Sequence, residues 1–260
     1  MKEAQVKLTV FDGIAVLTLN RPDSLNALSK EMVQALEARI DEIAVMPDVR
    51  VVILTGAGRG FSAGGDLKEF EAELKVDKSM LLKTLAYNQD VIQKLEDLPI
   101  PVIGAVNGFA VAGGLELLLT CDLLIASDKA KLGDGHAQFA IVPAGGATVR
   151  LMERLPPVRA AELLYTAKLF DAETLHDWGL INAVVPGESL MDHAMEMARE
   201  ISACSPEVIR HIKQMIRPSA NPKSRLGRLG SEIEHFAVHV EGEDLAKGLS
   251  AFSAKQKPVY

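Results

Sequence analysis

The feature that most constrains the fold of this chain is an Ala-Gly-Gly triplet that occurs three times, at residues 63–65, 112–114 and 144–146. The first two triplets each follow, by about one loop, an apolar segment that predicts a buried strand, at 49–55 and 102–106. All three precede residues that can begin a helix. A strand–loop–helix unit that recurs along the chain predicts an α/β protein built as a coil of layered ββα turns. The glycines match neither the dinucleotide-binding pattern nor the phosphate-loop lysine pattern, so a nucleotide-binding fold is not expected.

Apolar spacing predicts the remaining elements. Residues 6–19 alternate around Asp12-Gly13, a turn signal that predicts a β-hairpin. Ser29 can cap a helix whose apolar residues recur at helical spacing until Pro47 ends it. A further strand is predicted at 121–126, and further helices are predicted at 79–98, 158–166, 172–178, 190–203, 206–216, 223–240 and 243–254.

Composition excludes several classes of function. The chain is 48% hydrophobic and has a net charge of −7, which is typical of a globular protein and argues against a general polyanion binder. One basic stretch lies near the C-terminus, but most such runs are solvated helix faces, so no nucleic-acid partner is expected. Its members are Arg210, His211, Lys213, Arg217, Lys223, Arg225 and Arg228.

The cysteines and the apolar segments indicate a reducing, aqueous environment. Cys121 and Cys204 show no metal-like spacing, which predicts reduced, buried thiols and no metal site. The longest apolar stretch, 102–119, is interrupted by glycine, asparagine and glutamate, so it predicts a buried strand and helix rather than a membrane span. The first residues are typical of neither a signal peptide nor a transit peptide. We expect a cytoplasmic protein without membrane contact.

Glycine pairs before helices can carry chemistry. Glycine allows a close backbone approach to a ligand, and the first amides of a helix lack intrahelical acceptors. Two such amides from separate loops would form an oxyanion hole, with each donor contributing on the order of 3 kcal/mol to a transition state. The alternative is three tight turns that bind nothing.

Glu116 favours the functional interpretation. It lies three residues after Gly113 in an otherwise apolar helix start, where burying an unpartnered carboxylate is costly. A carboxylate beside a polarised carbonyl is well placed to move protons. The alternative is that Glu116 only stabilises the helix N-terminus through the macrodipole.

Three long motifs occur in order: GFSAGGDL at 60–67, PVIGAVNGFAVAGGLEL at 101–117 and IVPAGG at 141–146. They resemble motifs of the enoyl-CoA hydratase/isomerase (crotonase) superfamily, and the similarity extends over essentially the whole chain. The resemblance implies a crotonase-like β-spiral of ββα repeats at residues 1–200 and a C-terminal helical trimerisation region at 201–260. It also implies a homo-trimer or a hexamer made as a dimer of trimers.

The same resemblance implies an acyl-CoA substrate, with coenzyme A as part of the substrate and no separate cofactor. The backbone N–H groups of Gly65 and Gly113 would hold the thioester carbonyl, and Glu116 would be the catalytic acid/base. The resemblance also implies a set of CoA- and substrate-binding residues: Leu25, Ala27, Ala63, Asp66, Leu67, Phe252 and Lys255.

His136 departs from the family pattern. Hydratases of this family carry a second glutamate in the segment that follows the first, and here that position holds His136, with Asp134 two residues earlier. An imidazole titrates near neutral pH and could be the second acid/base. It could instead be a polar pocket residue that Asp134 orients.

Three functions remain open on these residues. The first is a hydratase-like enzyme that uses Glu116 and His136. The second is an enoyl-CoA isomerase or specialised lyase that uses Glu116 alone, since one base and an oxyanion hole suffice for a proton shift. The third is a CoA-thioester-binding protein without hydration chemistry. Ser62, beside the first glycine loop, is not expected to be a hydrolase nucleophile.

Overall fold

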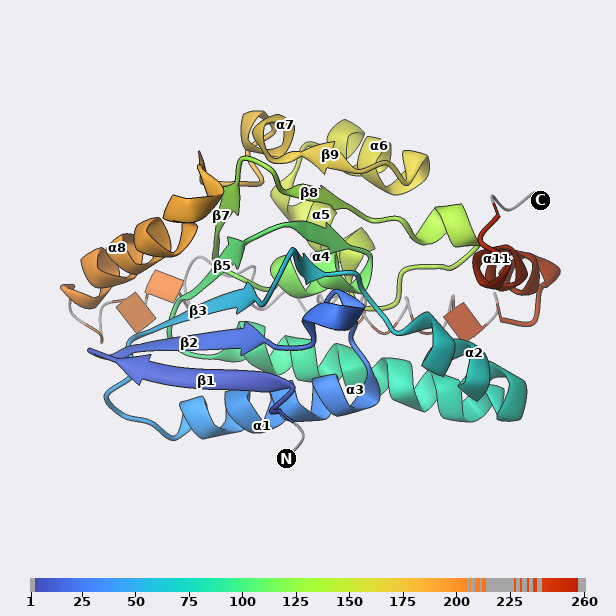
Figure 1. The fold of residues 1–260 in the computed structure, drawn as a ribbon, viewed down its shortest axis with the longest axis horizontal. Coiled ribbons are helices and arrows are strands. Elements are labelled where there is room, and N and C mark those ends of the chain that lie inside the picture. Colours follow the sequence, from blue (N-terminus) through green and yellow to red (C-terminus); the bar gives the residue numbers. More distant parts are fainter. Residues whose placement is uncertain are drawn as a thin grey trace.

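Two β-sheets, one of six strands and one of four, form the centre of the molecule (Figure 1). This computed structural model describes residues 3–204, 206, 209–210, 212–213, 227, 230, 233, 236–237 and 240–256. The larger sheet has the strand order β1 (Val6–Phe11), β2 (Ile14–Leu19), β3 (Val51–Gly56), β5 (Val102–Val106), β7 (Leu123–Ser127), β10 (Ala183–Val185). The smaller sheet has the order β4 (Gly60–Ser62), β6 (Phe109–Val111), β8 (Lys131–Gly133), β9 (Phe170–Asp171).

Consecutive strands alternate between the two sheets, which makes the chain a spiral. β3, β5 and β7 lie side by side in the larger sheet, and β4, β6 and β8, which follow them in turn, lie side by side in the smaller one. All these pairings are parallel. The predicted α/β spiral of ββα turns is confirmed, although the short strands of the smaller sheet had no sequence signal of their own.

Nine helices and three short 3-10 turns cover the sheets in the described part of the chain. The helices are α1 (Lys30–Ala44), α2 (Leu67–Val76), α3 (Lys78–Asp97), α4 (Gly113–Leu118), α5 (Ala147–Arg154), α6 (Pro157–Thr166), α7 (Ala172–Asp177), α8 (Leu190–Ser202) and α11 (Glu243–Ser253). The 3-10 turns are η1 (Pro22–Ser24), η2 (His136–Phe139) and η3 (Gly187–Ser189). The helices predicted at 206–216 and 223–240 lie largely outside the described residues, and the division at residue 200 stays a prediction.

Turn and capping residues near the N-terminus predicted the local structure correctly. The predicted hairpin is confirmed as β1 and β2, with Asp12 and Gly13 at φ 49° and 74° in the turn. The predicted cap is confirmed as well, since the Ser29 hydroxyl accepts a hydrogen bond from the Met32 N–H at 3.3 Å. The helix ends at Ala44, shortly before Pro47, because proline disfavours helical geometry in the residue that precedes it.

The central strands of the larger sheet are buried on both faces, whereas most of the edge strand β1 is exposed. Val52 and Leu54 of β3 pack in the apolar cluster that includes α1 and α3, whereas Val51 and Ile53 pack in the cluster that includes α8. Successive side chains of a strand point to opposite faces, so an uninterrupted apolar run suits a sheet between two layers of helices. Figure 1 shows α1 and α3 along one side of this sheet and α8 along the other.

Two sequence predictions need correction. The strand predicted at 121–126 begins at Leu123, because residues 121 and 122 complete the turn after α4: the Cys121 N–H donates to the Leu118 carbonyl. Cys121 is buried as predicted, and burial raises the pKa of its thiol to about 12. Cys204 is exposed, so the prediction of two buried thiols was wrong for this residue, which follows the C-terminal end of α8.

Within the described residues, no helix is both long and apolar enough to cross a membrane. The C-terminal helix α11 packs against the turn η2. Phe252 of α11 stacks edge-to-face on Phe139 of η2, with ring centroids 5.6 Å apart. Helix α11, near the C-terminus, is therefore in contact with the turn that carries His136.

Candidate active site

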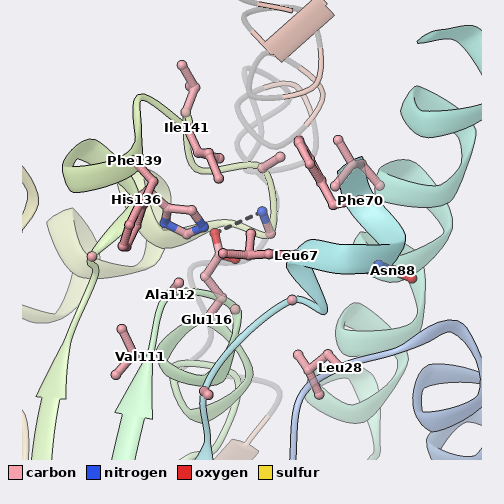
Figure 2. Close-up of a pocket in the computed structure, with 18 of the residues that line it drawn as sticks. Leu28, Leu67, Phe70, Asn88, Val111, Ala112, Glu116, His136, Phe139 and Ile141 are labelled. Carbon is pink, nitrogen blue, oxygen red and sulfur yellow. Dashed lines mark hydrogen bonds between the residues drawn. The ribbon is translucent and has the colours of Figure 1, made fainter. Parts of the chain in front are cut away.

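A cavity of about 240 Å³ opens where the ends of β4 and β6 meet α3 and the 135–145 segment. Figure 2 shows the side chains that point into it. Most of its wall is apolar, and the polar side chains come from α3, α4 and the η2 turn. The lining residues are Leu28, Val33, Ala63, Gly65, Leu67, Phe70, Leu85, Asn88, Ile92, Val111, Ala112, Gly113, Glu116, Gly135, His136, Gln138, Phe139, Ile141, Val142, Ala144, Gly145, Ala167, Leu169 and Phe236.

Gly65 and Gly113 lie close together at the wall of this cavity. Gly65 follows β4 and Gly113 begins α4, and a Cβ added to Gly113 would stand 3.3 Å from the Gly65 nitrogen. No acceptor for either backbone N–H is found among the residues that the structure describes. Two unpaired amides from separate loops thus lie beside the same cavity, as an oxyanion hole requires.

The backbone around these two amides is tightly packed. Gly64 has a φ of +88°, and a Cβ there would lie 2.7 Å from the Val111 carbonyl oxygen and 3.0 Å from the Gly113 nitrogen. Ala112, directly before α4, has φ 51° and ψ −120°, a conformation that costs a non-glycine residue on the order of 1–3 kcal/mol. Glycine at 64 and a strained residue at 112 allow the two loops to approach one another.

Glu116 points into the cavity from the first turn of α4 (Figure 2). Its Oε1 accepts hydrogen bonds from the N–H groups of Gly145 at 2.8 Å and Ala147 at 3.2 Å. Ala147 is the first residue of α5, so the carboxylate lies at the positive end of a helix other than its own. No described residue bonds to Oε2, which leaves one carboxylate oxygen available to a ligand.

The loop that holds Glu116 is itself held by α3. Arg150 is 1% exposed, and one of its terminal nitrogens donates to the Gly145 carbonyl at 2.6 Å. The guanidinium also binds Glu96 and Gln93 of α3 through Nε at 3.0 Å and a terminal nitrogen at 3.0 Å. A Cβ at Gly145 would collide with the Glu116 carboxylate, so only glycine permits this contact. The Gly145 peptide therefore joins Glu116 on one side to a buried ion pair on the other.

His136 is oriented by its own loop. Its Nδ1 lies 2.8 Å from Oδ1 of Asp134, and its backbone N–H donates to the other carboxylate oxygen at 3.3 Å. Asp134 is 1% exposed. An ionised carboxylate only accepts hydrogen bonds, so this contact places the proton of a neutral ring on Nδ1 and the lone pair on Nε2. Figure 2 shows the imidazole and the Glu116 carboxylate pointing toward one another.

The structure brings some of the expected substrate-binding residues into the cavity and leaves others outside it. Ala63 and Leu67 line it. Leu25 and Ala27 belong to the loop beside it, where the Leu25 carbonyl accepts the Ala63 N–H at 2.9 Å.

The other expected residues also lie outside the lining. Asp66 caps α2 and pairs with Arg21 at 2.9 Å. Phe252 reaches the wall only through Phe139, and Lys255 is exposed after the end of α11. Phe70 and Leu85 line the cavity, as family analogy predicts for the segment 67–87, whereas Asn88 and Ile92 of α3 were not predicted to lie there.

Two other interpretations of the sequence find no support in the geometry. Residues 60–64 match the Gly-x-Ser-x-Gly pattern of serine hydrolases, but Ser62 is fully buried and its hydroxyl donates to the Asn26 carbonyl at 2.9 Å. Lys213, a member of the basic stretch, is buried and binds Asp122 at 2.7 Å rather than facing solvent. His211, Arg217, Lys223, Arg225 and Arg228 lie outside the described residues. In the part of the chain with assigned positions, no group of His, Cys, Asp and Glu could hold a metal ion.

Comparison with known proteins agrees with this architecture. The sequence model of the enoyl-CoA hydratase/isomerase family matches residues 10–260. The short-chain-enoyl-CoA hydratase of Clostridium acetobutylicum is 36% identical over 245 residues, which cover 94% of this chain and 92% of that protein. The Bacillus subtilis protein YngF, which is named as an enoyl-CoA hydratase/isomerase by assignment only, is 38% identical over 250 residues. The match covers 96% of this chain and 95% of that protein.

Solved structures give the same result. A carnitinyl-CoA hydratase from Mycobacterium avium superimposes with a TM-score of 0.88 at 27% identity, covering 100% of this chain and 99% of that one. An enoyl-CoA hydratase from Bacillus anthracis superimposes with a TM-score of 0.79 at 32% identity and covers 98% of both chains. The fold is that of the crotonases, and the chain belongs to the enoyl-CoA hydratase/isomerase family.

Proposed function

We propose that this chain is an acyl-CoA-processing enzyme that adds water across the double bond of an enoyl-CoA thioester. One observation carries the proposal: two unpaired glycine amides lie at the same cavity as a carboxylate and an imidazole, each held by separate contacts. The family supports an acyl-CoA substrate. The geometry supports the chemistry, because hydration needs an electron sink and two proton-transfer groups.

The proposed steps use the groups already described. The N–H groups of Gly65 and Gly113 donate to the thioester oxygen and stabilise the enolate that forms when water attacks the β-carbon. The Oε2 atom of Glu116 and the Nε2 atom of His136 divide the proton transfers between them. Overall, one O–H bond of water breaks, a C–O bond forms at the β-carbon, and a proton is delivered to the α-carbon.

Asp134 gives His136 the properties that this role needs. Its carboxylate fixes the ring orientation, and it would stabilise an imidazolium formed during the reaction. The resulting pair would do the work of the second glutamate of the family pattern. In this proposal Asp134 positions His136 and does not touch the substrate.

A second candidate is double-bond isomerisation by Glu116 alone. It is favoured by one observation: Glu116 is the single carboxylate among the described residues that line the cavity. In an isomerase, Glu116 would take a proton from the α-carbon of a 3-enoyl thioester and return it to the γ-carbon, while the glycine amides stabilise the intervening dienolate.

The test is a panel of short-chain, long-chain and aromatic 2-enoyl-CoA and 3-enoyl-CoA thioesters. Hydration is followed as a mass gain of one water, and isomerisation as the appearance of the conjugated thioester without a mass change. Hydration of 2-enoyl thioesters supports the first proposal, and migration without hydration supports the second. Binding of the thioesters without any turnover would instead indicate a CoA-thioester-binding protein.

Several expectations extend this proposal beyond the cavity. We propose that Leu25, Ala27, Asp66, Phe252 and Lys255 contact the coenzyme A part of the substrate outside the acyl cavity. We also propose a trimer or a hexamer, in the cytoplasm, with no cofactor besides the coenzyme A of the substrate. Light scattering of the purified chain tests the oligomeric state, and a single-chain mass would overturn it.

A further inference from the structure

Gly248 is a buried glycine at the centre of α11. Glycine in a helix interior is less favourable than alanine by about 1 kcal/mol, so this position needs a reason to lack a side chain. The reason lies in η2, because a Cβ at Gly248 would lie 2.0 Å from the Phe139 carbonyl oxygen and 2.5 Å from its carbonyl carbon. The backbones of α11 and η2 therefore approach one another more closely than any residue other than glycine allows.

The turn η2 is only weakly closed by its own hydrogen bonds. The Gln138 N–H donates to the Gly135 carbonyl at 3.3 Å, and the Ala140 N–H donates to the Ala137 carbonyl at 3.4 Å. Gly135 and Ala140, which flank the turn, both have left-handed backbones, and none of the four residues between them is fully buried. Contacts from outside the turn are therefore needed to fix its position.

Helix α11 supplies such contacts and is itself anchored. Phe252, one helical turn after Gly248, stacks on Phe139 at 5.6 Å between ring centroids. The Ser253 hydroxyl donates to the Glu71 carboxylate of α2 at 3.4 Å. Leu245 and Leu249 pack in the apolar cluster that also includes Phe236 and residues of α2 and α3. A helix held in this way can fix the turn that it contacts.

We infer that Gly248 is a positioning residue, whose close contact with Phe139 holds η2 where His136 can reach the substrate. This inference rests on the proposed function, in which His136 transfers a proton. His136 is the first residue of η2 and Phe139 is the last, and both line the cavity. Asp134 orients the imidazole from one end of the turn, and α11 sets the other end. Gly248 itself does not touch the substrate.

Gly248→Ala tests this contact directly. A real Cβ stays at least 3.0 Å from such backbone atoms, so α11 and η2 would have to separate by about 1 Å. A misplacement of about 1 Å can cost about 10²-fold in rate. We expect kcat for hydration to fall about 10- to 100-fold, while calorimetry shows less than about a threefold change in the Kd of a saturated acyl-CoA thioester.

A double-mutant cycle with His136→Ala tests whether Gly248 acts through His136. The kcat for hydration is measured at saturating substrate for the unmodified chain, both single variants and the double variant. If Gly248 positions His136, Gly248→Ala has almost no further effect once the imidazole is absent. An equal loss in both backgrounds would indicate general damage to the site and would overturn the inference.

Gly230→Ala is the matched control. Gly230 is also helical but exposed, and a Cβ there would meet nothing within 4 Å, so this variant should keep the turnover of the unmodified chain. Phe252→Leu is a second test that introduces no backbone clash. It removes the ring contact with Phe139, and we expect a smaller loss of kcat that also disappears in the His136→Ala background. Thermal melting identifies any variant that fails to fold, and Phe252→Leu decides the matter if Gly248→Ala does.

The imidazole signal of His136 in NMR spectra gives a readout that does not depend on turnover. It should shift in Gly248→Ala and stay unchanged in Gly230→Ala. An unchanged signal in Gly248→Ala would contradict the inference.

The outcomes separate two failures. If His136→Ala lowers hydration but Gly248→Ala does not, or if the two losses multiply, the inference about Gly248 is wrong and the proposed function stands. If His136→Ala leaves hydration unchanged, or if no enoyl-CoA is hydrated, the proposed function fails and the inference falls with it.

Discussion

The two side chains that we propose as proton-transfer groups, Glu116 and His136, are held in different ways. Glu116 is fixed by backbone N–H groups that lie 29 and 31 residues further along the chain. His136 is fixed by the side chain of Asp134, two residues away in its own loop. The position of Glu116 therefore depends on the packing of distant segments, whereas the orientation of His136 is a local property of one loop.

The orientations of Glu116 and His136 therefore depend on different sets of contacts. The Glu116 side is rigid because the donor loop is bound to Arg150, and Arg150 is bound to α3. The His136 side depends on one carboxylate for its ring orientation, and on α11 for the packing of the turn. Changes on the first side should affect both activity and stability, and changes on the second should affect activity almost alone.

The largest effect is expected from Glu116→Gln. The amide keeps the size of the side chain and can still accept from Gly145, but it cannot take up a proton. Turnover of the enoyl-CoA substrate should fall by a factor of about 10²–10⁴, while saturated thioesters still bind. Steady-state kinetics and calorimetry on the same preparation measure the two quantities. Unchanged turnover would contradict any role of Glu116 in proton transfer.

Arg150→Met tests the rigid side of the comparison. It removes the ion pair between Arg150 and Glu96 and the hydrogen bond to the Gly145 carbonyl, so the free energy of unfolding should fall by about 3 kcal/mol. Urea denaturation gives the value. The double variant Arg150→Met/Glu96→Leu should recover part of the loss, because apolar residues of similar volume can replace a buried ion pair. An unchanged unfolding midpoint in the single variant would show that the ion pair does not hold the loop.

His136→Ala tests the locally held group. If hydration uses both groups, its rate should fall about 10²-fold, whereas isomerisation by Glu116 alone should be largely retained. His136→Glu is the matched variant, since it restores the residue type of the family pattern and should recover hydration. Equal loss of both reactions in His136→Ala would contradict the division of labour between the two groups.

The smallest effect is expected from Asp134→Asn. The amide can still contact the ring but can present a donor to Nδ1, so part of the population adopts the wrong tautomer. We expect about a tenfold loss of turnover, little change in KM and a changed pH profile for turnover. Asp134→Ala should cost more than Asp134→Asn. If both variants keep the pH profile of the unmodified chain, Asp134 has only a packing role.

Much of the fold followed from local pattern. The hairpin at Asp12-Gly13, the helix capped by Ser29 and the strand at 102–106 were predicted from spacing and turn chemistry, and all three are present. The strand β9, of two residues, and the start of β7 were not predicted correctly, because short elements take their pairing from neighbours rather than from periodicity.

The residues of the candidate site also include some that the sequence indicated and some that it did not. Motif resemblance indicated Gly65, Gly113, Glu116 and His136, and the structure places all of them at one cavity. Arg150 could not be predicted as buried, since an arginine in an amphipathic helix is ordinarily exposed. Its burial follows from three acceptors that other segments supply.

The sequence by itself determined the hairpin, the three long strands that follow it, most of the longer helices, the family and the two glycine loops, because these depend on residues that are neighbours in the chain. Only the tertiary structure decided that Gly64 packs against Val111, that Glu116 is held by the N-terminus of α5, and that Asn88 faces the cavity. The physical reason is that a pattern records which face of an element is apolar, but not which distant segment covers it. The winding of the spiral decides which distant segment covers each apolar face.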